Sequence, residues 1–201
     1  MSPRPQRTPS QLIVPEVMNA ALQLLSESGP EGFTVRAIAR KANVAPMAIY
    51  NHFDGKNGLL DAIWTEGFTI LQRELAPIGG DPEDELLRSG IAYRKFALEH
   101  KSHYTVMFMN RFVGFTPSIA AAYVATRAFQ ELVKHIERCQ SVGMFPDIAS
   151  DNLAQMLWAA CHGYISLEIL DINFARDRDE TFLQFLSGVQ RGFDALRVEP
   201  R

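Results

Sequence analysis

Residues 43–56, NVAPMAIYNHFDGK, bring together side chains that could recognise a nucleic acid. Met47 and Ala48 are apolar groups that could touch a thymine methyl group. Tyr50, Asn51 and His52 follow with groups that can hydrogen-bond to phosphates or bases. His52 has an equally good second interpretation, as a polar residue that only closes a helix. The spacing favours binding chemistry over catalysis.

The remaining candidates for chemistry predict neither a metal site nor an active site. His100 and His103 could share a helix face, but no third ligand accompanies them. Cys161 and His162 are neighbours, and neighbours on a helix point about 100° apart. There is no Ser-His-Asp order, phosphate loop or paired carboxylate. We therefore expect no metal and no cofactor, and a protein that is not an enzyme.

Short helices are expected to position the segment 43–56. Val17 to Leu25 repeat at helical spacing, with Pro15 in the first turn, and Gly29-Pro30 and Gly32 end that helix. Thr34 can cap a second helix, and Asn43 suits a tight turn because Asn tolerates left-handed backbone angles. A third helix should cover 45–52. Its distance from the second is the spacing of a helix-turn-helix, whose last helix enters the major groove of DNA.

The rest of the chain also shows helical spacing and no alternating strand pattern. The pattern predicts an all-α protein with about nine helices. A fourth helix should run from Lys56 to about residue 76, and Ser150 or Asp151 should cap the helix that starts near 151. The later helices are expected at about 83–100, 102–112, 117–142, 151–174 and 180–196.

Composition and charge set the broad class of the chain. It has 201 residues, 47% of them hydrophobic and 21% charged, which is an ordinary globular composition. Two isolated cysteines, and no signal peptide or long apolar run, favour the cytoplasm. Residues 1–60 carry six basic and four acidic side chains, a net charge of +2, and the other 141 residues carry −5. A basic head on an acidic body suits a protein whose head contacts DNA.

Residues 20–63 resemble the tetracycline-repressor-like (TetR) family of bacterial transcription regulators. The resemblance is carried by GFTVR at 32–36, IA at 38–39, ANV at 42–44, IYNHF at 49–53, Lys56 and LL at 59–60. Asn43 stands where the family usually has Gly, and Pro46-Met47 are less usual at the start of the recognition helix. The expected DNA contacts are Thr34, Arg36, Ala45, Pro46, Met47, Ala48, Tyr50, Asn51, His52 and Lys56. Apolar residues of the same segment, such as Phe33, Ile49 and Phe53, should instead form a small core.

The resemblance implies that the C-terminal helices sense a ligand and form a dimer. The stretch WAACHGYISLE, 158–168, is similar to a Trp, His-Gly signature of one branch of these domains. The last two helices have broad apolar faces that could pack across a two-fold axis, or only within one subunit. The expected dimer residues are Leu153, Met156, Leu157, Ala160, Tyr164, Leu167, Phe182, Phe185, Leu186, Val189 and Phe193.

Aromatic, methionine and histidine side chains predict a pocket for a small apolar molecule, although the same residues could form a plain core. The expected ligand contacts are His103, Tyr104, Met107, Phe108, Phe112, Tyr123, Trp158 and His162. Two domains follow: 1–56 for DNA, including an N-terminal tail, and 57–201 for ligand sensing and dimerisation.

The interpretation that unites these patterns is a homodimeric, ligand-responsive transcriptional repressor. Helix 45–52 would bind each half of a near-palindromic operator, and a small apolar or aromatic ligand would release the DNA by moving the helix 56–76 as a lever. Two alternatives stay open. The chain could be a helical enzyme or binding protein for an apolar small molecule, or a helical adaptor that binds no DNA.

Overall fold

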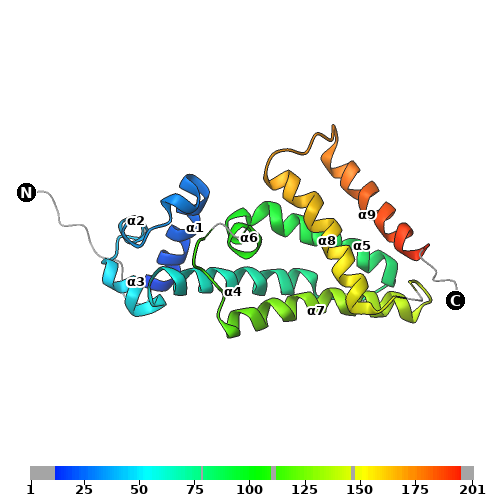
Figure 1. The fold of residues 1–201 in the computed structure, drawn as a ribbon, viewed down its shortest axis with the longest axis horizontal. Coiled ribbons are helices and arrows are strands. Elements are labelled where there is room, and N and C mark those ends of the chain that lie inside the picture. Colours follow the sequence, from blue (N-terminus) through cyan, green and yellow to red (C-terminus); the bar gives the residue numbers. More distant parts are fainter. Residues whose placement is uncertain (1–11, 78, 110–111, 146–147, 196–201) are drawn as a thin grey trace, which may run out of the picture. The chain divides into compact units, whose positions relative to one another are not determined.

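The computed structural model describes residues 12–77, 79–109, 112–145 and 148–195, and within these ranges every regular element is a helix (Figure 1). This confirms the all-α prediction. The helices in the described ranges are α1 Ile13–Gly32, α2 Val35–Lys41, α3 Pro46–Phe53, α4 Gly55–Leu75, α5 Pro82–Glu99, α6 Lys101–Phe108, α7 Ile119–Ser141, α8 Ser150–Ile169 and α9 Arg178–Asp194. None of them combines the length and apolar character that a membrane crossing needs.

The chain forms two compact units, and each contains two separate stretches of sequence. The first unit comprises residues 1–68 and 100–124, and the second comprises residues 69–99 and 125–201. The helices α4 and α7 therefore each contribute residues to both units. The packing units do not follow the predicted functional boundary at 56/57, because α6 and the start of α7 cluster with α1 to α3. That functional boundary stays a prediction.

The first unit is built on one apolar core beneath the three N-terminal helices. Apolar residues at helical spacing on α1, α2 and α3 face this core, which Val106 of α6 and Phe112 also join. Its fully buried members include Val17, Ala21, Phe33, Ile38, Ile49, Leu59, Leu60 and Ile63. The core thereby fixes α3 from beneath and leaves the opposite face of that helix in solvent.

The second unit combines an apolar core with buried charged groups. Leu86, Ile136, Phe145 and Leu153 belong to its apolar cluster. Across α5, α8 and α9, Arg94 forms a bidentate ion pair with Glu168, with N–O distances of 2.6 and 2.9 Å, and a third bond to Asp179. These bonds raise the pKa of the Arg94 guanidinium, because they favour its charged form.

Several predicted boundaries and one predicted cap differ from the structure. The helix α6 ends at Phe108 rather than at Phe112, whose ring turns into the first core against Phe33. The helix α8 ends at Ile169 rather than near 174, because Asp171 adopts a left-handed φ of 55° and closes the last turn. Neither Ser150 nor Asp151 caps α8. Ala149 is the N-cap, and the Ser150 hydroxyl instead donates to Gln140.

Candidate nucleic-acid interface and apolar hollow

Local backbone chemistry builds the helix-turn-helix. The Thr34 hydroxyl accepts a hydrogen bond from the Ala37 amide at 3.2 Å and so caps α2, as predicted. Asn43 turns the chain with a φ of 54°, which also confirms the prediction from its residue type. Ala45 is extended and Pro46 occupies the first turn of α3, where its missing N–H costs nothing. Asp54, at a φ of 58°, then separates α3 from α4.

One face of α3 is buried and the opposite face lies in solvent. Ile49 and Phe53 pack into the first core. Met47 is 64% exposed and Tyr50 is 54% exposed. Pro46 and Asn51 are exposed beside them, as is His52, whereas Ala45 and Ala48 are half-buried. A helix placed this way can present apolar and polar groups together to a groove.

Gly55 keeps the Tyr50 ring close to the start of α4. A methyl group at Gly55 would lie 3.1 Å from Cε1 of Tyr50, and the Gly55 φ of +84° disfavours other residues as well. This fit helps to fix the direction of the tyrosine ring, and the sequence pattern contained no sign of it.

Basic groups surround α3 unequally. Arg36, in the first turn of α2, is exposed. Lys41 instead forms an ion pair with Glu27 at 2.9 Å. The Lys56 ammonium lies over two aromatic rings, 5.8 Å from the centroid of Phe33 and 5.7 Å from that of Phe112. Both rings are within the range of a cation–π interaction.

A small apolar hollow lies within the first unit. Its volume is about 170 Å³, which suits one or two rings. The hollow is lined by four aromatic residues, Trp64, Phe108, Phe112 and Phe115, together with Val106, Met107 and Pro117. Of the predicted ligand contacts, the structure therefore brings Met107, Phe108 and Phe112 to one cavity. Trp64, Val106, Phe115 and Pro117 were not among the predicted contacts, and only the aromatic types of Trp64 and Phe115 offered a signal.

The other predicted ligand residues of the first unit lie elsewhere. Tyr104 is fully buried and packs on Phe108, with ring centroids 4.8 Å apart. His103 is buried, and its Nε2 lies 3.0 Å from Oε2 of Glu66. This hydrogen bond lowers the pKa of the Glu66 carboxyl. Tyr123 is 65% exposed and does not line the hollow.

Trp158 and His162 belong to the second unit, where they share a buried tyrosine. The Tyr93 hydroxyl accepts from the Trp158 indole at 3.1 Å and lies 3.2 Å from Nδ1 of His162. Burial lowers the pKa of His162. In this arrangement a neutral His162 ring whose Nδ1 carries no proton accepts a hydrogen bond from the Tyr93 hydroxyl. The two residues are thus partners in one hydrogen-bonded cluster, and Tyr93 is the member that local sequence spacing did not reveal.

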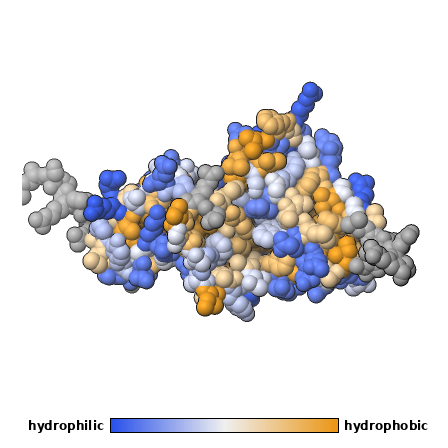
Figure 2. Space-filling model, in the orientation of Figure 1, coloured by the Kyte–Doolittle hydropathy of each residue, from blue (hydrophilic) through white to orange (hydrophobic). Residues whose placement is uncertain are grey.

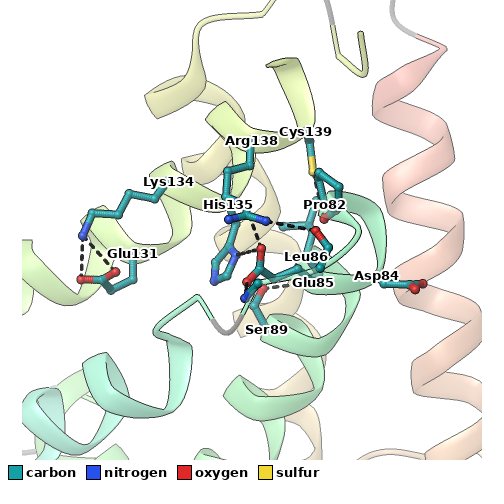
Figure 3. Close-up of polar contacts among 12 residues, drawn as sticks. Pro82, Asp84, Glu85, Leu86, Ser89, Glu131, Lys134, His135, Arg138 and Cys139 are labelled. Atoms are coloured by element: carbon teal, nitrogen blue, oxygen red, sulfur yellow. Dashed lines mark hydrogen bonds and ion pairs between the residues drawn. The ribbon is translucent and has the colours of Figure 1, made fainter. Parts of the chain in front are cut away.

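A second polar cluster holds the end of α4 within the second unit. Figure 3 shows its members Glu85, His135 and Arg138. Nε2 of His135 donates to the Leu75 carbonyl at 2.7 Å, and its Nδ1 faces Oε2 of Glu85 at 4.0 Å. Nε of Arg138 lies 2.8 Å from the same Glu85 oxygen. One turn earlier on α4, Gln72 donates to Glu131 of α7. The last turn of α4 is therefore fixed to α7 by polar bonds and not by apolar packing alone.

The predicted dimer residues divide by exposure. Leu153, Leu157, Phe182 and Leu186 are buried inside the subunit, whereas Met156 is 38% and Leu167 is 46% exposed. The partly exposed remainder are Ala160, Tyr164, Phe185, Val189 and Phe193. Exposure within one subunit does not show which of these residues meet a partner, so all of the assignments stay predictions.

A strip of α8 and α9 faces solvent beside the buried residues. Methyl groups placed at Gly163 of α8, or at Gly188 or Gly192 of α9, would meet no atom within 4 Å. Exposed Leu183 and Leu167 lie on the same two helices. Figure 2 shows hydrophobic colouring among polar patches over this part of the surface.

Comparisons with known proteins agree with this geometry. The sequence profile of "Bacterial regulatory proteins, tetR family" matches residues 17–63, and that of "Tetracyclin repressor-like, C-terminal domain" matches 86–189. The class D tetracycline repressor of Escherichia coli is 27% identical over 202 residues, covering 89% of this chain and 87% of that protein. An uncharacterised helix-turn-helix regulator of Mycobacterium tuberculosis, Rv0681, is 27% identical over 191 residues, covering 91% and 84%.

Solved structures show the same fold. A Rhodococcus sp. RHA1 protein of unknown function superposes with a TM-score of 0.78 at 22% identity, over 94% of this chain and 98% of that one. The regulator PfmR of Thermus thermophilus has a TM-score of 0.71 at 18% identity, over 87% and 97%. The finer assignment to the Trp, His-Gly branch stays a prediction.

Proposed function

We propose that this chain, which belongs to the tetR family of bacterial regulatory proteins, is a homodimeric repressor. In this proposal, binding of a small apolar or aromatic ligand releases the protein from DNA. Members of this family are transcriptional regulators, and the named relatives are repressors and regulators rather than enzymes. The single observation that carries the proposal is the exposed face of α3, formed by Pro46, Met47, Tyr50 and Asn51 above a fully apolar core.

The DNA-binding part of the proposal rests on the geometry of α2 and α3. In a helix-turn-helix, the N-terminal residues of the second helix meet base edges. Met47 supplies an apolar group for thymine methyls, and Tyr50 and Asn51 supply hydrogen-bonding groups. Thr34, Arg36 and Lys56 are the proposed phosphate contacts on either side, while His52 sits at the end of α3.

A homodimer supplies the second recognition helix for a near-palindromic operator. We assign its interface to the exposed strip of α8 and α9, with Met156, Gly163, Leu167 and Gly188 in contact across the two-fold axis. Small residues let two helix pairs approach closely, which favours a four-helix bundle. The buried members of the predicted set, such as Leu153 and Phe182, would support this interface from within each subunit.

The proposed ligand enters the hollow beside α4. Its aromatic lining and its volume of about 170 Å³ favour an apolar molecule of one or two rings. The helix α4 contributes Trp64 to this lining, starts directly after α3, and is held at its end by His135. A ligand that binds better to one position of α4 than to another would shift the equilibrium between binding and released forms. We place the protein in the cytoplasm, where its DNA target lies.

The experiment that tests this function is a gel-shift titration with DNA from immediately upstream of the coding region, repeated over a salt series. We expect saturable binding whose logarithmic affinity falls linearly with the logarithm of salt concentration. Tyr50→Ala with Lys56→Ala should abolish selective binding while the protein remains folded by circular dichroism. Lys41→Ala is the matched control, since Lys41 is paired with Glu27 and should change affinity little. Equal binding by the double variant and the wild type would refute the proposal.

A further inference from the structure

Phe112 belongs to two sites at once. It is one of the residues that line the apolar hollow. Its ring lies 5.7 Å from the Lys56 ammonium and packs edge-on against Phe33, with centroids 5.3 Å apart. Phe112 is only 6% exposed, so its position is set by packing. All of these residues belong to the first unit.

The two rings hold an ammonium group that would otherwise be free to sample many positions. Lysine carries a point charge on a flexible four-carbon stem, so its position is set by what surrounds its end. The negative faces of Phe33 and Phe112 attract that charge, and the exposed side of Lys56 keeps N–H groups available to solvent or to a phosphate. Phe33 lies between α1 and α2, whereas Phe112 follows α6. Phe112 thus brings a contact from a distant part of the chain to Lys56, at the start of α4.

We propose that Phe112 is a positioning residue for the DNA contact made by Lys56, and that occupancy of the hollow is transmitted to Lys56 through this ring. This inference rests on the proposed function, since it presupposes that Lys56 contacts a phosphate. It adds a route for regulation that does not require α4 to move as a lever. A group that fills the hollow presses on Phe112 and displaces the ring from the ammonium.

The first test compares two buried phenylalanines of the first unit. Phe112→Leu removes the ring beside Lys56. Phe68→Leu is the matched control, because Phe68 is buried against Trp64 and Phe108 but is not part of the lining of the hollow. We expect Phe112→Leu to weaken binding to the upstream DNA about threefold to tenfold. It should also reduce the salt slope by about 0.9, the loss of one phosphate contact. Phe68→Leu should leave the slope unchanged. Equal slopes in both variants would overturn the inference.

The second test needs no DNA. In protein labelled with ¹³C at the lysine ε carbon, the Lys56 proton resonances should be shifted upfield by the two rings. Phe112→Leu should remove a large part of that shift, and Phe68→Leu should not. Val106→Ile adds a carbon to the lining of the hollow and stands in for a ligand. It should move the Lys56 resonance in the wild-type background and not in Phe112→Leu.

The two tests separate the failure of the inference from the failure of the function. If the Lys56 resonance changes as expected but no variant binds DNA, the contact between Phe112 and Lys56 is supported and the proposed function is refuted. If the protein binds DNA but the Lys56 resonance changes in neither Phe112→Leu nor Val106→Ile, the inference alone is refuted. Thermal melting of each variant checks that the fold is retained.

Discussion

The two units differ in what they bury. Among the described residues of the first unit, the buried side chains with polar groups are His103 and Tyr104, and none carries a carboxylate. The second unit buries Glu85, Glu131, His135, Glu168 and Gln190, as well as Ser89. Ion pairs and hydrogen bonds connect most of these groups to other helices. The first unit therefore depends mainly on apolar packing, and the second also depends on the geometry of buried charges.

This difference fits the functions proposed for the two units, DNA binding by the first and dimerisation by the second. An apolar core is compatible with many different residues on the solvent-exposed side of a helix. The exposed residues of α3 can therefore serve DNA binding without disturbing the packing beneath that helix. Buried charged pairs contribute little net stability, but they are costly to break, which favours one arrangement of helices. Such a unit can hold the end of α4 and the strip of α8 and α9 in a defined position.

The largest expected effect comes from breaking a buried pair of the second unit. Arg94→Met leaves the buried Glu168 carboxylate without its bidentate partner, and should lower the free energy of unfolding by about 3 kcal/mol. Lys41→Met breaks the exposed pair with Glu27 in the first unit, and should cost at most about 0.5 kcal/mol. Urea denaturation of the two variants measures the contrast. Equal losses would remove the distinction between the units.

The next effect concerns assembly. Gly163→Arg places a long charged side chain on the exposed strip of α8, where the wild type leaves open space, so the subunit itself should remain folded. Across a two-fold axis the change occurs twice, and we expect the dimer dissociation constant to rise at least about a hundredfold. Sedimentation velocity measures the change. Val142→Arg, at an exposed position after α7, is the control. A dimer unaffected by Gly163→Arg would move the interface elsewhere.

Helix caps should behave alike in both units, because capping is local. Thr34→Ala removes the acceptor of the Ala37 amide, and Asp177→Ala removes the acceptor of the Asp179 and Glu180 amides at the start of α9. Each should lower the free energy of unfolding by about 1 kcal/mol. Thermal denaturation checks both. A cost confined to one cap would show that its unit compensates by other contacts.

Local patterns in the sequence were sufficient for the helix-turn-helix of the first unit. The cap at Thr34, the turn at Asn43 and the buried side of α3 follow from residue type and helical spacing, and the structure confirms them. The partners of Trp158 and His135 could not be found in this way. Tyr93 is 65 residues from Trp158, and Leu75 is 60 residues from His135, so only the tertiary fold brings them together. The lining of the hollow is a tertiary feature for the same reason.

The smallest effect is a pH dependence of the second unit. Burial lowers the pKa of His162 in the folded state, so the unfolded chain binds the proton more tightly. The contribution of the neutral His162 ring to the free energy of unfolding is complete above the ordinary histidine pKa of about 6.5. It decreases as the pH falls towards the lowered pKa of the folded state. His162→Asn should flatten this part of the pH profile in urea denaturation between about pH 5 and pH 7.5. An unchanged profile would assign the dependence to another group.

The central claim is that α3 reads DNA, and site-specific crosslinking tests it most directly. A benzophenone amino acid would replace the exposed Met47 on α3 in one sample and the exposed Val142, after α7, in another. Each would be irradiated with upstream DNA that the wild type retards. The account predicts crosslinks from position 47 to bases in both halves of the operator, and none from position 142. Crosslinks from position 142 would contradict the account. So would a complex that still forms but gives no crosslink from either position.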